Sequence, residues 1–245
     1  MLHKVMKTVA PVAGLALGAM LAGCSVEMGT GGMDGVTLAE LDVSAEAPTG
    51  VALVGPDNIS VSRGDRFDVD VTGDADAVDA VRFELDGDTL KVGRMKNAGR
   101  DLGKAQVLVV LPSLRTIALA GSGDVVSDHF DGDGEVSIAG SGTARLGQIA
   151  TQKLEVAIAG SGSVEGEGST DTLEVSVAGS GSTRLAGLKA GNADVSIAGS
   201  GDVAFASDGK VDASIMGSGD VAVTGNATCT VSAMGSGKLR CSSGS

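Results

Sequence analysis

Few side chains in this 245-residue sequence are of the kinds that perform enzyme chemistry. Beyond residue 23 the chain holds one histidine, His129, with Asp128 and Asp131 near it, and Tyr and Trp are absent throughout. A Ser-His-Asp hydrolase would need His129, yet no serine stands in the Gly-x-Ser-x-Gly arrangement that exposes a nucleophile. No Gly-x-x-x-x-Gly-Lys-Ser/Thr phosphate loop occurs either. We therefore expect His129 to be a solvated turn residue and the protein not to be an enzyme.

Acidic residues at glycine-rich turns raise the question of calcium binding. Asp124, Asp202 and Asp220 each follow a Gly-Ser-Gly triplet, and Asp131 and Asp133 occupy another acidic turn. Calcium-binding β-rolls repeat such a motif about every nine residues, whereas the period here is about twice that. The positions equivalent to these aspartates in other repeats are Thr143, Ser163, Ser182 and Lys238. Because calcium takes six to eight oxygen ligands, we expect solvated turn acids, with no metal site and no cofactor.

The N-terminus has the features of a targeting signal. Lys4 and Lys7 precede an apolar run from Val9 to Leu21, which is too short to span a bilayer but suits the core of a signal peptide. Leu21-Ala22-Gly23-Cys24 then resembles the bacterial lipoprotein box. This resemblance implies cleavage after residue 23 and lipidation of Cys24. The alternative is an ordinary secretory signal with an incidental cysteine.

A lipid on Cys24 would anchor the protein to a membrane, because several acyl chains on one residue bind stably. Ser25 follows Cys24, and in Gram-negative lipoproteins a residue other than Asp there implies the outer membrane. Residues 24–35, rich in Gly and Met, predict a flexible tether. Loss of residues 1–23 removes two lysines and no acid, which leaves 16 basic and 31 acidic residues and a charge of −15. Such a surface disfavours nucleic acid as a partner.

The rest of the chain is organised by a Gly-Ser-Gly triplet that returns every 18 to 20 residues. A fixed period of this length indicates a solenoid. The triplets begin at Gly121, Gly140, Gly160, Gly179, Gly199, Gly217 and Gly235. Glycine at these places permits a bend and a close approach between coils that a Cβ would obstruct. The central serines, Ser122 to Ser236, should form a ladder along one edge.

Apolar residues alternate with polar ones on both sides of each triplet. They stand two and four residues before the first glycine, and usually four and six after it, with Thr183, Ser127 and Gly166 as departures. This period of two indicates strands with one buried face. A strand-turn-strand unit of this size buries its apolar face only by stacking on like units. We predict an all-β fold, a parallel β-helix of about 18–20 residues per coil.

The predicted domain organisation is simple. Residues 36–241 form a single β-helix domain, in which 36–115 are irregular first coils and 116–241 are regular Gly-Ser-Gly coils. Residues 1–23 are the signal peptide, 24–35 the tether and 242–245 a tail. Asp74 to Ala80 is expected to make one helical turn.

Four segments, residues 67–74, 88–92, 111–114 and 120–125, read FDVDVTGD, DTLKV, LPSL and AGSGDV. In this order they resemble the auto-transporter adhesin head GIN domain family. The resemblance spans about residues 40–241 and implies a right-handed parallel β-helix on secreted or envelope proteins, often lipoproteins. It supplies no catalytic residues.

Cys229 and Cys241 are the two thiols that remain once Cys24 is set aside. They stand six residues before and six after Gly235, where other repeats have apolar residues. Both should therefore face the core, and outside the cytoplasm they are free to oxidise. We expect a disulfide that staples the last coil; two buried free thiols are the alternative.

The function expected from the sequence is that of a non-enzymatic envelope lipoprotein whose β-helix presents an adhesin-like or structural interaction surface. Its partner would be an unknown protein or glycan. The alternative is a β-helix enzyme or binding module that acts on an envelope or extracellular polysaccharide. Against an enzyme, the chain has four Phe and no other aromatic residue with which to build a sugar platform.

Overall fold

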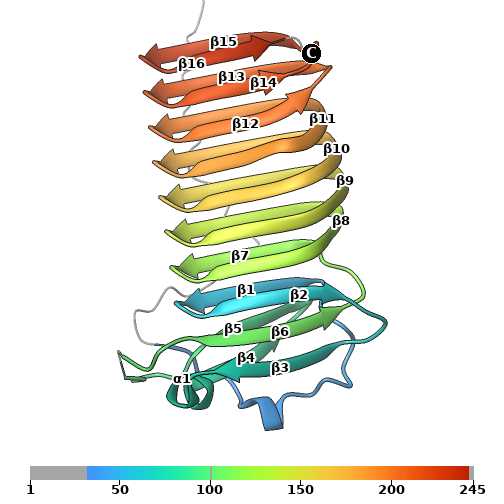
Figure 1. Ribbon diagram of the computed structural model, residues 1–245, viewed down its shortest axis with the longest axis vertical. Coiled ribbons are helices and arrows are strands. Elements are labelled where there is room, and N and C mark those ends of the chain that lie inside the picture. The colour runs from blue at the N-terminus through green and yellow to red at the C-terminus, as the bar shows by residue number, and fades with distance from the viewer. Residues whose placement is uncertain (1–31, 100, 243–245) are drawn as a thin grey trace, which may run out of the picture. The chain divides into compact units, whose positions relative to one another are not determined.

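The computed structural model describes residues 32–99 and 101–242, which lie in one compact unit. The predicted signal peptide, Cys24, the first part of the tether (24–31) and residues 243–245 lie outside the described residues. No described helix is long and apolar enough to cross a membrane. The unit consists mostly of strands with very little helix, and the prediction of a parallel β-helix is confirmed (Figure 1).

The regular coils follow one another from β7 to the last strands, and Figure 1 shows them stacked in chain order. Their strands are β7 (Thr116–Gly121), β8 (Asp124–Gly140), β9 (Thr143–Gly160), β10 (Ser163–Gly179), β11 (Ser182–Gly199), β12 (Asp202–Ser207), β13 (Lys210–Gly217), β14 (Asp220–Thr224), β15 (Thr228–Gly235) and β16 (Lys238–Ser242). Each of β8 to β11 runs through a whole coil, so its two halves lie in opposite faces. All these strands pair in parallel.

Each Gly-Ser-Gly triplet forms a sharp corner between the two faces. The first glycine has φ between 125° and 136° in all seven corners, a conformation that L side chains rarely adopt. At Gly160 an added Cβ would also lie 2.5 Å from the carbonyl oxygen of Gly140 in the coil below. The central Ser161 is exposed, and its amide donates to that same oxygen at 2.9 Å. Gly162 is buried, and a Cβ there would meet Ile138 at 2.6 Å. Both glycines are therefore required by the stacking.

The interior is made of apolar columns, one residue per coil. The predicted inward positions are buried in every coil from β7 to β14, as in the column of Leu119, Ile138, Ile158, Val177, Ile197 and Ile215. Burying one such side chain contributes about 1.5–3 kcal/mol. Thr183 and Ser127, which depart from the apolar pattern, are buried in register all the same. Gly166 pairs with Leu146 of β9 and is half-buried, and the register shifts directly after it, because Gly147 of β9 has no partner in β10.

The N-terminal coils are less regular and end in antiparallel strands. They comprise η1 (Leu38–Glu40), β1 (Gly50–Gly55), β2 (Asn58–Arg63), β3 (Asp68–Gly73), α1 (Ala75–Ala80), β4 (Val81–Asp86), β5 (Thr89–Arg94) and β6 (Ala105–Leu111). β1 pairs in parallel with β7, and β2 with β8, so the solenoid continues into them. β3 and β4 then pair antiparallel to β6 and β5 and close both faces.

A buried ion pair secures this first coil. Gly55-Pro56-Asp57 stands where later coils have Gly-Ser-Gly, and Gly55 pairs with Gly121. The Asp57 side chain is 1% exposed. It accepts from Nε and Nη2 of Arg94 at 2.8 and 2.7 Å and from the amide of Ala105 at 2.8 Å. The hydrogen bond with Asp57 raises the pKa of Arg94 above its ordinary value.

Candidate functional site

His129 is not a solvated turn residue, so that prediction was wrong. It lies within β8, is 3% exposed, and brings Nδ1 to 2.5 Å from a carboxylate oxygen of Asp128. Its Nε2 is buried without a partner. Ser127 donates its hydroxyl to the backbone oxygen of His129 and not to the ring. The three residues therefore form a local structural contact and not a nucleophile-base arrangement.

Asp128 and Asp131 are held by Arg63 of the neighbouring strand. The Arg63 guanidinium lies 2.7 Å from Asp131, and the Arg63 amide donates to Asp128. Burial opposes ionisation of Asp128, but the hydrogen bonds from His129 and Arg63 outweigh it and hold the pKa of Asp128 below its usual value. These acids join β2 to β8.

The aspartates at other turns also serve the stacking. The carboxylate of Asp202 accepts the amide of Asp220 in the next coil at 3.0 Å, and Asp220 accepts the amide of Lys238 in the same way. At the opposite corner Asn192 and Asp208 cap the amides of Lys210 and Asn226. Each of these side chains satisfies a backbone donor one coil further on. Within residues 32–99 and 101–242 no three His, Cys, Asp or Glu side chains are grouped so as to hold a metal ion.

One face of the solenoid presents three ordered rows to solvent; we call it the carboxylate face. It is formed by β7, the C-terminal halves of β8 to β11, β13 and β15. Its outward rows, aligned by strand pairing, are Glu135, Glu155, Glu174, Asp194 and Asp212; then Ser137, Ala157, Ser176, Ser196 and Ser214; then Ala139, Ala159, Ala178, Ala198 and Met216. Neighbouring members of a row are about 4.8 Å apart.

Two lysines moderate the repulsion along the carboxylate row. Lys153 Nζ lies 3.0 Å from Glu174 and 3.3 Å from Glu155. The hydrogen bond to Glu174 is the main cause that raises the pKa of Lys153, burial opposes it, and the hydrogen bond to Glu155 adds to the rise. Lys210 pairs with Asp212. The row thus remains an accessible, net negative strip beside small hydroxyl and methyl groups.

The other face carries mixed charge. Glu165 lies between Arg145 at 3.2 Å and Arg184 at 3.4 Å, one on each neighbouring strand. Exposed pairs of this kind contribute about 0–1 kcal/mol each. They leave this face with most of its charges already paired.

An open depression lies at the corner opposite the Gly-Ser-Gly turns, over β8, β9 and β10. It is lined by Arg115, Gly132, Asp133, Ala150, Thr151, Gln152 and Ser169. Arg115 lies over Gly132, where an added Cβ would come 3.2 Å from Nε. The lining offers hydrogen-bond donors and acceptors of both charges but no aromatic ring. Such a site suits a hydroxylated ligand held by hydrogen bonds.

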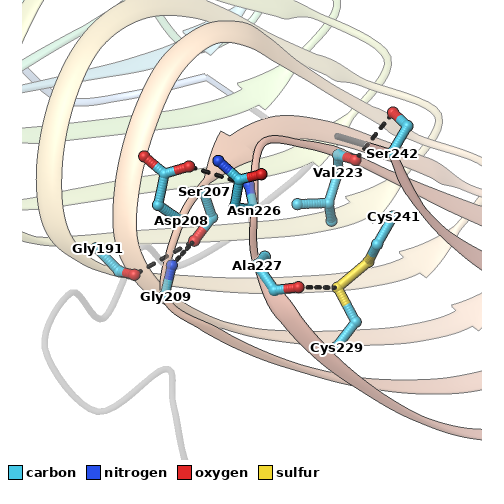
Figure 2. The surroundings of a disulfide bond; sticks show 10 residues. All are labelled: Gly191, Ser207, Asp208, Gly209, Val223, Asn226, Ala227, Cys229, Cys241 and Ser242. Carbon is cyan, nitrogen blue, oxygen red and sulfur yellow. Dashed lines mark hydrogen bonds between the residues drawn. A yellow bond between two sulfur atoms is a disulfide. The ribbon is translucent and has the colours of Figure 1, made fainter. Parts of the chain in front are cut away.

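The two cysteines of the last coil are joined by a disulfide, with 6.8 Å between their Cα atoms (Figure 2). Cys229 pairs with buried Val211, and Cys241 with buried Val223, so both stand at inward positions. Cys229 is nevertheless only half-buried and Cys241 is exposed. The expectation that both face the core and form a disulfide is therefore confirmed, but neither is enclosed, because no described coil lies above them.

Comparison with known proteins agrees with the architecture. These stacked coils with their ordered outer rows define a β-solenoid. The chain belongs to the family described as "Putative auto-transporter adhesin, head GIN domain", whose profile matches residues 47–227. The resemblance seen in the sequence is thereby confirmed. No curated protein matches the chain.

Solved structures of similar fold include proteins of Bacteroides and Parabacteroides. A putative adhesin of Bacteroides fragilis has a TM-score of 0.73 and 22% identity, over 80% of this chain and 93% of that one. A putative lipid binding protein of Parabacteroides distasonis has a TM-score of 0.62 and 24% identity, with the same coverages. A putative adhesin of Parabacteroides merdae has a TM-score of 0.61 and 18% identity, over 80% and 92%. At these identities the likeness shows the fold alone.

Proposed function

We propose that this protein is a non-enzymatic, lipid-anchored adhesin-like scaffold of the cell envelope, and that its carboxylate face binds a protein or glycan on another surface. The observation that carries the proposal is the register of the outer rows over five consecutive coils. A rigid, repeating surface of small side chains suits shape-based and backbone contacts spread over a large area, and not the enclosure of a small substrate.

Matched variants of the two faces test this proposal. Ser196→Arg places a long cation in the middle of the carboxylate face, and Ala222→Arg places the same group on the opposite face. The purified proteins would be probed on a glycan array and with isolated envelope fractions. We expect the wild type and Ala222→Arg to retain the same ligand and Ser196→Arg to lose it. Retention of that ligand by Ser196→Arg, or the absence of any ligand for the wild type, would contradict the proposal.

The anchor is a separate part of the proposal and rests on the signal and box that end at Cys24. Labelled palmitate should be incorporated into the wild-type protein and not into Cys24→Ser, and the variant should accumulate as an uncleaved precursor. Ser25 after the cysteine supports the outer membrane as destination. A soluble wild-type protein with an unmodified N-terminus would refute the anchor and leave the binding face untouched.

A polysaccharide-binding module is the second candidate, and the depression beside Arg115 favours it. In that case Arg115→Ala should abolish polysaccharide binding while Ser196→Arg leaves it intact. Arg184→Ala, on the face of mixed charge, is the matched arginine control. The opposite pattern assigns binding to the carboxylate face.

A further inference from the structure

The C-terminal end of the solenoid is uncovered in the part of the chain that the structure describes. β15 pairs on one side with β13, and β16 on one side with β14, and their other edges pair with no described strand. The inward residues of this coil are accordingly exposed. Val231 is 48% exposed, whereas its partner Ala213 in the coil below is 5% exposed, and Leu239 is half-buried above fully buried Val221.

The opposite end is closed on both faces. On β4, Val36 exchanges two backbone hydrogen bonds with Phe83, each 2.8 Å long. On β3 the carboxylates of Asp68 and Asp70 accept the amides of Val69 and Val71, which face away from β6. Blocking an edge with charged side chains is a known means of preventing strand addition. Among the described residues, the solenoid is therefore protected at one end and open at the other.

The open end has a shape that few partners match. It offers two strand edges at once, β15 and β16, with an apolar strip of Val231, Ala233 and Leu239 between them. A single extended peptide would cover one edge and leave the strip exposed. The same end of a second copy carries both edges at the same separation. A two-fold axis normal to both faces would pair β15 with the partner's β15 and β16 with the partner's β16, each antiparallel.

Charge also favours a second copy at this end. The chain has a net charge of −13, yet residues 221–242 contain no Asp or Glu. Their two cations are Lys238 and Arg240, and Arg240 is paired with Asp220 at 3.2 Å. The outward residues of β15 are uncharged: Thr228, Thr230, Ser232 and Met234. Two copies that meet at this end therefore bring no carboxylates close to each other. Two copies that met through their carboxylate faces would do so, and the like charges would repel.

The disulfide keeps this edge ready for pairing. It links β15 to β16 across the last coil, where few contacts from above restrain them. An edge that frayed would lose the register on which antiparallel pairing depends. From these observations we propose that the protein forms a two-fold homodimer by end-to-end pairing of its C-terminal coils, which continues both sheets and buries the apolar strip.

A pair of valine variants tests the dimer. Val231→Lys puts a charge into the apolar strip, at a position already half exposed. Val126→Lys puts the same charge on the outside of β8, where the valine is 41% exposed. All samples start at residue 24, without the predicted signal peptide, and carry Cys24→Ser, so that neither an acyl group nor the apolar run from Val9 to Leu21 promotes association. Sedimentation analysis should give the mass of two chains for the parent and for Val126→Lys, and of one chain for Val231→Lys. A monomeric parent, or a dimeric Val231→Lys, would overturn the proposal.

Hydrogen exchange of the parent provides a readout that needs no folded variant. Dilution below the dissociation constant should increase amide exchange in β15 and β16 and leave exchange in β3 and β4 unchanged. Equal exchange in β15 and β16 at all concentrations, or a change confined to β3 and β4, would contradict pairing through the C-terminal coils.

Discussion

The buried pair between Asp57 and Arg94 provides the sharpest test of how the first coil is held. Asp57→Ala would remove a carboxylate that is 1% exposed and accepts three hydrogen bonds. The Arg94 side chain, 11% exposed, would keep its contact with the Gly103 oxygen but lose its counter-charge. The amide of Ala105 would lose its acceptor.

Removal of one partner from a buried pair costs about 3–5 kcal/mol, because the remaining charge stays desolvated. An orphaned amide by itself costs about 1–3 kcal/mol. We therefore expect Asp57→Ala to lower the free energy of unfolding by about 3–5 kcal/mol. Replacement of both partners, by Asp57→Ala with Arg94→Met, should recover a large part of that loss, since no unpaired charge is left.

Urea unfolding followed by far-ultraviolet circular dichroism measures these differences. Arg66→Ala is the control, because Arg66 and Asp68 form an exposed pair at 3.5 Å, and its effect should stay within about 1 kcal/mol. If Asp57→Ala were as mild as Arg66→Ala, or if the double variant were less stable than Asp57→Ala, the account of this pair would be refuted.

Three further outcomes are expected. Gly160→Ala should destabilise the protein by more than about 2 kcal/mol in thermal unfolding, because it combines a φ of 125° with a Cβ 2.5 Å from a carbonyl oxygen. The control, Ser161→Ala, should stay near the wild type. Equal melting midpoints for the two variants would contradict the corner geometry. The unfolded, non-reduced chain should show no reactive thiol at Cys229 or Cys241, and reduction should lower stability by about 3 kcal/mol; two reactive thiols would exclude the disulfide. The pKa of Asp128 lies below its ordinary value of 3.8, so the ionised carboxylate contributes its full stabilisation above pH 3.8 and loses it as the pH falls further. Asp128→Asn should therefore weaken the dependence of the melting midpoint on acid pH. An unchanged dependence would refute this role of Asp128.

Much of the architecture follows from local features of the sequence. The alternation around each triplet determines which side chains point inward, because successive residues of a strand face opposite sides. The return of Gly-Ser-Gly marks the corners, since glycine tolerates both the positive φ and the contact with the coil below. The same alternation places Cys229 and Cys241 at inward positions of one coil. It also determines which residues point outward, because they alternate with the buried ones. Their alignment into rows along one face follows only from the register between strands.

Other features were decided only by the tertiary structure. His129 lies among acids and glycines that indicate a turn, yet β8 continues through this stretch, where His129 pairs with Gln148 of β9 and is buried. Asp57 and Arg94 are 37 residues apart, and nothing local indicates that they meet. Asp202 and Asp220 resemble solvated turn acids until the next coil supplies the amides that they accept.

The features that the sequence determines depend on neighbouring residues, whereas those that the tertiary structure determines depend on residues one or more coils away. Alternation and turn chemistry act within one coil and can be read along the chain. Burial, pairing and capping depend on what lies one coil above or below, and therefore on the register between strands and on register shifts such as the one after Gly166. The last coil shows this most clearly: Val231 and Val195 occupy equivalent inward positions, but Val195 is buried and Val231 is exposed, because among the described residues only Val195 has a coil on both sides.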